Sequence, residues 1–356
     1  MGSMKVFIVV PDFRRDHKEV CFFIVARTLQ YNIIKSGYQC RIVPNSTETD
    51  RLRATLDRAV VIVFTPWIDC IRDINCRVIL YNSESLKSPV FGKKARECIR
   101  DPRVFQIWDY CYNNALLSRS TKKHIMMPIG YSPNNDFPIR QHKKMFDIIL
   151  YGTHLGTHPG DTRFKRREAI LNAINQRPSI FDNYNSDCLD IEFYTGYYKD
   201  LNGMSEKKAR RHWLKWGQHE NRQCCGKSSR LKNFWITQFA SLEQKLEYIG
   251  ASKIVLIIHT YECDKPIDYF RIVELIKNKC FFIMEKPQDS ESVLYERYRD
   301  YIVFSEYDKI LDTCLVYLNK TQEERNMAAE RLYRFWMQAE DYSSRVKGAL
   351  GQVPFI

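Results

Sequence analysis

The sequence predicts an α/β protein built from two doubly wound parallel sheets. Short continuous apolar runs recur along its 356 residues, among them 146–151 and 254–258. Such runs are typical of strands buried on both faces of a parallel sheet. Between them lie segments with apolar residues at helical spacing, so strands and helices alternate. A turn-rich polar stretch at 130–135 separates this alternation into two halves.

Apolar runs in the first half predict the strands of one sheet, at 6–10, 40–43, 60–64, 77–81 and 104–108. The segment after the first run places its apolar side chains on one helical face, and Gly37 follows it. Because glycine accepts the left-handed backbone that ends many helices, we expect Gly37 to close this helix.

The second half begins with the run at 146–151, which a polar loop and a basic helix from about Arg163 follow. A different segment, 193–225, is rich in aromatic and basic residues, with Ser205 placed to cap a helix and Gly217 placed to end it. It resembles a short helical module appended to surface-polysaccharide and viral proteins. We expect a small helical hairpin with a docking or structural role.

These patterns predict how the domains are arranged along the chain. We expect a Rossmann-like domain over 4–132, a linker over 133–145 and a second Rossmann-like domain over 146–330, with the module at 193–225 inserted in it. The remaining residues, 331–356, are expected to form a helix that crosses back to the first domain. A cleft is expected between the two domains.

Composition narrows the class of partner. The net charge of +13 implies attraction to an anion, which leaves a nucleotide sugar, nucleic acid or an acidic membrane surface. A nucleic-acid arm is not favoured, because no run of five or six Lys and Arg occurs. The twelve cysteines show no Cys-x-x-Cys spacing, and no apolar stretch reaches the length of a membrane span. We expect a reduced, cytoplasmic protein with no integral membrane segment.

The segment 252–285 holds the strongest functional signal. It reads as strand, loop, helix and strand. His259 follows the first strand, Arg271 and Glu274 lie on the helix, and Glu285 ends the second strand. Ligands of parallel α/β sheets collect at the carboxyl ends of strands and at helix N-termini. These side chains are therefore placed to hold a small anionic ligand, although Arg271 and Glu274 also have the spacing of a pair on one helical face.

This segment resembles the donor-binding half of GT-B glycosyltransferases, especially those related to spore-maturation and giant-virus enzymes. Three stretches of the first half extend the resemblance: Asn82-Ser83-Glu84, Trp108-Asp109-Tyr110 and the turn from Pro128 to Ser132. The resemblance implies two Rossmann-like domains that face a cleft. It also implies transfer of a sugar from a nucleoside diphosphate to a hydroxyl of a glycan or protein.

The resemblance implies a donor site in the second domain. Arg271 would face the diphosphate, Glu274 would lie nearer the sugar and Glu285 would bind the ribose hydroxyls. The glycine-bearing loop after the strand at 146–151 lies at a strand end, so we expect it to belong to the donor site, together with Arg166 or Arg167 on the helix that follows. The donor residues expected in addition are Gly152, Thr153, Arg167, His259 and Tyr261.

On the acceptor side, Asp109 and Glu84 are the candidates for a base that deprotonates the acceptor hydroxyl. His259 is either an active-site residue or a structural histidine. Loops of the first domain and the domain junction would contact the acceptor through Asp12, His17 and Tyr131. Each of these residues also has an ordinary loop interpretation.

No cofactor is expected beyond a nucleotide sugar, UDP- or GDP-linked, as substrate. No metal is expected either, because the sequence lacks a convincing Asp-x-Asp at a strand end. Two other classes stay open beside the transferase, namely a nucleotide-sugar epimerase and a degenerate domain that binds glycans without catalysis. The oligomeric state and the identity of the acceptor are open as well.

Overall fold

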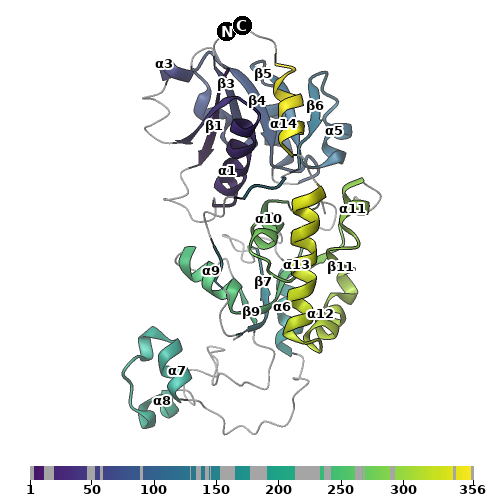
Figure 1. The fold of residues 1–356 in the computed structure, drawn as a ribbon. Helices are drawn as coiled ribbons and strands as arrows, with labels where there is room; N and C mark the ends of the chain where they lie inside the picture. Colours follow the sequence, from purple (N-terminus) through teal and green to yellow (C-terminus); the bar gives the residue numbers. More distant parts are fainter. Residues whose placement is uncertain are drawn as a thin grey trace.

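The computed structural model describes residues 4–11, 20–45, 53–56, 59–88, 91–128, 130–133, 138–140, 144, 146–152, 165–176, 191–212, 233–235, 242–260, 267, 269–288, 293–339 and 342–353. In these ranges the chain forms two lobes, each around one sheet (Figure 1). Both ends of the chain lie at the far end of the first lobe. In this part of the chain no helix is long and apolar enough to cross a bilayer.

The first lobe contains a six-stranded sheet in which every pair of neighbours is parallel, in the order β2-β1-β3-β4-β5-β6. Its strands are β1 (Lys5–Pro11), β2 (Gln39–Asn45), β3 (Val60–Phe64), β4 (Arg77–Asn82), β5 (Val104–Asp109) and β6 (Lys123–Met126). The first five lie where the apolar runs predicted them. The side chains of β3 are all buried, as a strand covered on both faces requires.

The connections of the first sheet are α1 (Val20–Lys35), α3 (Arg53–Leu56), the 3₁₀ helix η2 (Thr65–Ile71), α4 (Gly92–Arg100) and α5 (Tyr112–Ser118). The end of α1 is confirmed at the predicted glycine. Gly37 has a φ of +93°, and the Tyr38 amide donates to the Ile33 carbonyl at 3.2 Å.

The second lobe contains a five-stranded parallel sheet in the order β11-β10-β9-β7-β8. Its strands are β7 (Phe146–Leu150), β8 (Asn233–Trp235), β9 (Ser252–Ile257), β10 (Phe282–Glu285) and β11 (Val303–Ser305). Its helices are α6 (Lys165–Gln176), α9 (Leu242–Gly250), α10 (Tyr269–Lys277), α11 (Val293–Tyr298), η6 (Tyr307–Lys309) and α12 (Ile310–Leu318). The two doubly wound parallel sheets predicted from the sequence are thus confirmed.

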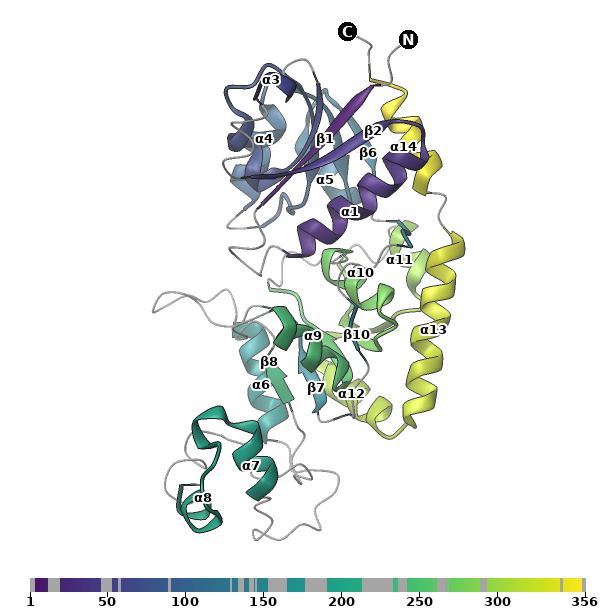
Figure 2. The same ribbon diagram turned by 60° about the vertical axis from the view of Figure 1, so that its left-hand side comes forward.

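The C-terminal part of the chain consists of two helices where one was expected. The first, α13 (Gln322–Ala339), runs along the second lobe and packs against α10. The second, α14 (Tyr342–Leu350), lies on the first lobe and packs against α1. The chain therefore returns to the first lobe after Ala339, as Figures 1 and 2 both show.

The inserted module stands apart from both sheets (Figure 2). It contains α7 (Ile191–Tyr197), η3 (Lys199–Leu201) and α8 (Glu206–His212). Tyr194, Leu201 and Ala209 form a small core of their own, and the Tyr194 hydroxyl lies 3.0 Å from Nδ1 of His212. Within the described residues, His212 therefore has a packing role in the module.

Helix α10 connects the two lobes. Its Phe270 is 8% exposed, and its ring lies 5.7 Å from the ring of Tyr110 and 6.2 Å from that of Tyr81, both in the first lobe. At the other end of the helix, Lys277 Nζ donates to the hydroxyl of Thr28 on α1 at 3.1 Å and to that of Ser132 at 3.0 Å. The two lobes thus share one continuous apolar core.

Candidate functional site

The carboxyl ends of the two sheets face each other across α10. This helix follows the carboxyl end of β9 in the second sheet. Its Phe270 packs against Phe64 and Tyr81, which lie at the carboxyl ends of β3 and β4 in the first sheet. The α/β proteins bind their ligands at the carboxyl ends of the strands of a parallel sheet. Functional side chains from both lobes therefore converge on this region.

Gly152, directly after β7, allows an arginine to approach the backbone closely. Arg167 on α6 is 1% exposed, and its Nε donates to the carbonyl of Ile258 at 2.8 Å. Gly152 has a φ of +147°, and a Cβ at this position would lie 2.9 Å from Cζ of Arg167. Backbone conformation and space both require glycine here. The predicted donor residues Gly152 and Arg167 are therefore in contact.

Glu285 ends β10 with its carboxylate inside the protein. The side chain is 1% exposed, and one oxygen pairs with the guanidinium of Arg166. The other oxygen accepts the backbone N–H of His259 at 3.0 Å. The Arg166 guanidinium also lies 4.0 Å from the ring centroid of Tyr307. In this arrangement Glu285 orients Arg166 and the end of β9, and ribose hydroxyls would have to compete with both partners.

Glu274 on α10 is likewise buried with partners from other elements. Nζ of Lys245, on α9, lies 2.9 and 2.8 Å from its two carboxylate oxygens, and the hydroxyl of Tyr151 donates to one of them. The Tyr151 ring lies between two cations, with Lys245 Nζ 5.0 Å and the Arg271 guanidinium 5.9 Å from its centroid. Glu274 thus pairs with Lys245, a residue that no sequence pattern singles out.

Together these side chains form an electropositive group, which we call the basic cluster. It contains the cations of Arg166, Arg167, Lys245 and Arg271 and the carboxylates of Glu274 and Glu285. Four positive charges against two negative charges leave an excess of two. Arg167 and both carboxylates are 1% exposed, so little water screens these charges. The excess positive charge therefore acts more strongly on a ligand than it would at the surface. The cluster is suited to a diphosphate.

At the carboxyl edge of the first sheet, Asp109 is the centre of a polar network. Its carboxylate is fully buried and accepts hydrogen bonds from Nδ2 of Asn82 at 2.8 Å, the Cys111 amide at 2.9 Å and Nδ2 of Asn114 at 3.0 Å. Burial raises the pKa of Asp109 to about 7, although these hydrogen bonds act in the opposite direction. Because the Asp109 carboxylate has no contact with solvent, it cannot contact a sugar acceptor directly.

The same network also forms hydrogen bonds with the backbone of Glu84. The Glu84 amide donates to Oδ1 of Asn82 at 3.3 Å, and its carbonyl accepts Nδ2 of Asn114 at 3.0 Å. Both asparagines are bound to Asp109. Glu84 itself is only half-buried. Of the two predicted base candidates, Glu84 is therefore the one placed to reach a ligand, and Asp109 is placed to fix the loop that carries it.

The other predicted residues have the following places. His259 is 6% exposed, and its Nε2 lies 3.2 Å from the carbonyl of Glu285, so its contacts hold the strand end together. Tyr131 packs edge-on against Trp336 of α13 at 5.3 Å between ring centroids, and it belongs to the domain junction. The predicted site residues Asp12, His17, Thr153 and Tyr261 lie outside the described residues.

Over the ranges that the structure describes, no group of three or more His, Cys, Asp or Glu side chains gathers as a metal site would require. Sequence reasoning did not single out Lys245, a member of the basic cluster, or Tyr151, which contacts the cluster. Tyr151 ends a recognisable strand, which is a usable signal. Lys245 has none, since only its pairing across 29 residues marks it.

Comparison with known proteins gives matches in structure alone. No protein-family model matches the sequence, and no curated protein matches it. Among solved structures, the N-terminal domain of Candida albicans trehalose-6-phosphate phosphatase superposes with a TM-score of 0.50 at 7% identity, with 98% of each chain covered. Together with the two facing parallel sheets and the C-terminal return to the first lobe, this match decides the architecture. The chain has the GT-B fold.

Two further solved structures are similar at lower TM-scores. AviGT4, a glycosyltransferase involved in avilamycin A biosynthesis, matches with a TM-score of 0.48 at 10% identity, covering 97% of this chain and 98% of that one. TarM matches with a TM-score of 0.48 at 9% identity over 85% of this chain. The present chain spans 57% of the length of TarM. At such identities the likeness concerns the GT-B fold alone.

Proposed function

We propose that the chain is a glycosyltransferase that moves a sugar from a nucleoside diphosphate to a hydroxyl of a glycan or protein, without a bound metal. The observation that carries this proposal is the basic cluster. It has two positive charges in excess and lies at the carboxyl edge of the second sheet, while Glu84, a half-buried carboxylate, lies at the carboxyl edge of the first. A transferase of this kind needs both a diphosphate site and a base.

In the proposed reaction the acceptor oxygen forms a bond to the anomeric carbon while the bond from that carbon to the diphosphate breaks. The leaving diphosphate gains negative charge, and Arg271 and Lys245, which flank Tyr151, stabilise it together with the backbone at Gly152. The proton of the acceptor hydroxyl passes to Glu84. The charges of Arg166 and Arg167, which lie deeper in the protein, make the electrostatic potential at the diphosphate more positive.

Buried ion pairs prepare the site before the donor arrives. Lys245 and Arg166 are fixed by Glu274 and Glu285, so the positive charges need little reorganisation on binding. This division of roles differs from the expectation that Glu285 binds the ribose. We propose that Glu285 positions Arg166 and that the ribose is bound by other groups.

A thermal-shift screen tests the donor class. The purified chain is heated with UDP, GDP, CDP or ADP and with their common sugars, each in the presence of Mg²⁺ and of EDTA. A ligand at a hundredfold excess over its dissociation constant should stabilise the protein by about 2.7 kcal/mol. We expect one diphosphate to raise the melting temperature equally with and without Mg²⁺.

Each other outcome of the screen argues against part of the proposal. Stabilisation that requires Mg²⁺ would contradict metal independence. If no nucleotide shifts the melting temperature but oligosaccharides do, the chain is a glycan-binding scaffold. If a nucleotide sugar binds and its sugar is isomerised without any acceptor, the chain is an epimerase.

A further inference from the structure

The first lobe contains two stretches that carry basic residues but no acidic ones. Residues 85–96 hold Lys87, Lys93, Lys94 and Arg96, and residues 110–135 hold Arg119, Lys122 and Lys123. Neither stretch contains Asp or Glu. The first leads into α4, and the second contains all of α5. These two stretches therefore carry seven positive charges and no negative one, which an anionic surface would complement, although the exposed Glu97 follows on α4.

The same stretches expose large apolar side chains. Leu116 and Leu117 at the end of α5 are 66% and 42% exposed, and Phe91 at the start of α4 is 45% exposed. These are three of the seven large hydrophobic side chains that the described chain exposes. Two adjacent exposed leucines on a helix of only seven residues have no evident packing role.

The start of α4 lies next to α5. The amide of Leu86 donates to Oδ1 of Asn114 on α5 at 2.8 Å. The carbonyl of Leu86 lies against Gly92, the first residue of α4, so closely that a Cβ there would be 2.5 Å from it. Phe91 is the neighbour of Gly92, and Leu116 follows Asn114 by two residues. The starts of both helices are therefore side by side.

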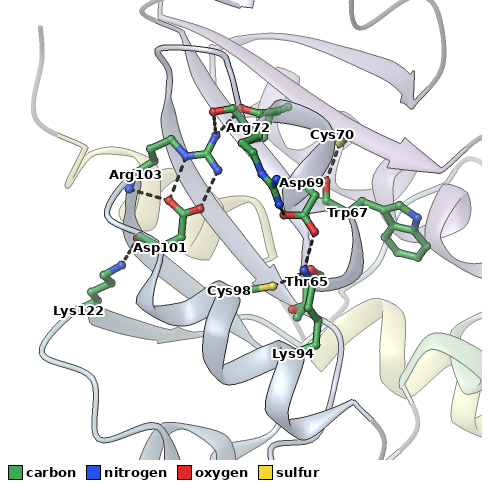
Figure 3. A network of polar contacts seen from close by, with 11 residues as sticks. Thr65, Trp67, Asp69, Cys70, Arg72, Lys94, Cys98, Asp101, Arg103 and Lys122 are labelled. Atoms are coloured by element: carbon green, nitrogen blue, oxygen red, sulfur yellow. Dashed lines mark hydrogen bonds and ion pairs between the residues drawn. The ribbon is translucent and has the colours of Figure 1, made fainter.

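The basic side chains of this region fall into two groups. Some are engaged internally: Lys94 Nζ lies 2.5 Å from Asp69, and Lys122 donates to the Asp101 carbonyl (Figure 3). Lys93, Arg119 and Lys123 are instead exposed to solvent. We call the surface formed by Phe91, Lys93, Leu116, Leu117 and Arg119 the basic-apolar surface. Lys123 is not part of it, because His124 is the β6 residue that contacts Ser118 of α5, and its neighbour Lys123 points to the opposite face of the sheet.

We propose that the basic-apolar surface binds the face of an anionic lipid bilayer. Leu116, Leu117 and Phe91 enter the boundary between headgroups and acyl chains, while Lys93 and Arg119 pair with lipid phosphates. Nucleic acid would pair with the basic residues through its phosphates but would not bury two exposed leucines. An anionic bilayer interacts favourably with both kinds of side chain, so we choose it as the partner.

The surface adjoins the candidate acceptor edge. Helix α5 begins three residues after Asp109, and Asn114 holds both Leu86 and the backbone of Glu84. Binding through α5 thus brings the Glu84 loop close to the bilayer. The proposal does not depend on the proposed transferase function, because lipid binding is measured without any sugar donor.

Co-sedimentation of the full chain with vesicles tests the proposal. Vesicles of phosphatidylcholine alone are compared with vesicles that also contain phosphatidylserine, at low and at high salt. We expect binding to the anionic vesicles alone, weakened by salt. Leu116→Asp with Leu117→Asp should weaken the partition at least about tenfold, and Lys93→Glu with Arg119→Glu should do the same.

Matched controls lie in the second lobe. Val316 and Met327 are 57% and 58% exposed, so Val316→Asp with Met327→Asp makes the same chemical change elsewhere. Lys309→Glu with Lys320→Glu reverses two other exposed charges. Both control pairs should bind vesicles as the wild type does. Leu116→Ala with Leu117→Ala, which keeps the charge, serves if the aspartate pair fails to fold.

Three results would overturn the proposal. The first is a wild-type chain that stays in solution with both vesicle types. The second is equal binding by the α5 variants and the control variants. The third is binding to a random oligonucleotide, lost in Lys93→Glu with Arg119→Glu, without any binding to vesicles, which would assign the surface to nucleic acid.

Discussion

At the scale of single residues, neighbours in the sequence have different partners and different roles. Arg166 and Arg167 are adjacent on α6, but the first pairs with Glu285 and the second donates to the carbonyl of Ile258 beneath Gly152. The sequence predicted that one of them serves the donor site but not which one. Only packing decides that, because successive positions on a helix point about 100° apart.

Gly152 provides the clearest test at this scale. Gly152→Ala places a methyl group 2.9 Å from the guanidinium of a buried arginine and imposes an unfavourable φ. We expect a loss of about 1–3 kcal/mol in the free energy of unfolding and weaker diphosphate binding. Chemical denaturation measures the first effect and calorimetric titration the second.

Gly348→Ala is the matched control for this substitution. Gly348 lies within α14, and a Cβ there meets nothing within 4 Å. Alanine should therefore be neutral or slightly stabilising at this position. If both variants behave alike, the close approach of Arg167 to the Gly152 backbone is wrong.

Asp109 predicts a pH dependence of stability. Its pKa is raised by burial from the ordinary 3.8 to about 7, so the folded protein binds its proton more tightly than the unfolded chain does. The contribution of this group to stability is complete below pH 4 and is lost as the pH rises through 7. We expect it to amount to a few kcal/mol, on the order of 1.4 per unit of pKa difference.

Denaturation at a series of pH values measures this contribution as the difference between wild type and Asp109→Asn. The asparagine variant should be less stable throughout, since its amide presents a donor where the carboxylate accepted three hydrogen bonds. Its deficit should shrink as the pH rises from 4 to 7. The exposed Asp308→Asn should show no such trend, and a constant deficit for Asp109→Asn would refute the assignment.

At the scale of elements, α10 serves both lobes. Its Arg271 and Glu274 belong to the basic cluster, while Phe270 packs among the aromatic rings of the first lobe. The sequence predicted this helix and its neighbouring strands because their apolar runs are long and regular. It did not predict the contacts of its polar residues, because the partner of Glu274 lies on a helix 29 residues away. Arg166 and Glu285 are separated by 119 residues.

Phe270→Ala tests the role of α10 as a connector. Removing a ring that is 8% exposed leaves a cavity between the lobes, and the expected loss of stability is about 3–5 kcal/mol. Thermal unfolding followed by circular dichroism measures it. Phe91→Ala, where the ring is 45% exposed, is the control and should cost little. Equal effects of the two substitutions would contradict a packed junction at Phe270.

At the scale of the whole molecule, the two parallel sheets followed from apolar runs and their order, and the resemblance to GT-B enzymes added two domains that face a cleft. The different roles of Asp109 and Glu84 at the carboxyl edge of the first sheet did not follow from the sequence. Asp109 ends its strand as predicted, yet Asn82 and Asn114 turn its carboxylate into the protein. The amide side chains are the physical reason, and their spacing in the sequence does not reveal that they converge.

The central claim is that the basic cluster holds the diphosphate of a sugar donor. The most direct measurement is calorimetric titration of the diphosphate that stabilises the chain best, into wild type, Arg271→Ala and Arg334→Ala. Arg334 is 68% exposed on α13 and lies outside the cluster. We predict that Arg271→Ala binds about tenfold more weakly or worse, and that Arg334→Ala binds as the wild type does. Equal affinities for all three proteins would contradict the account.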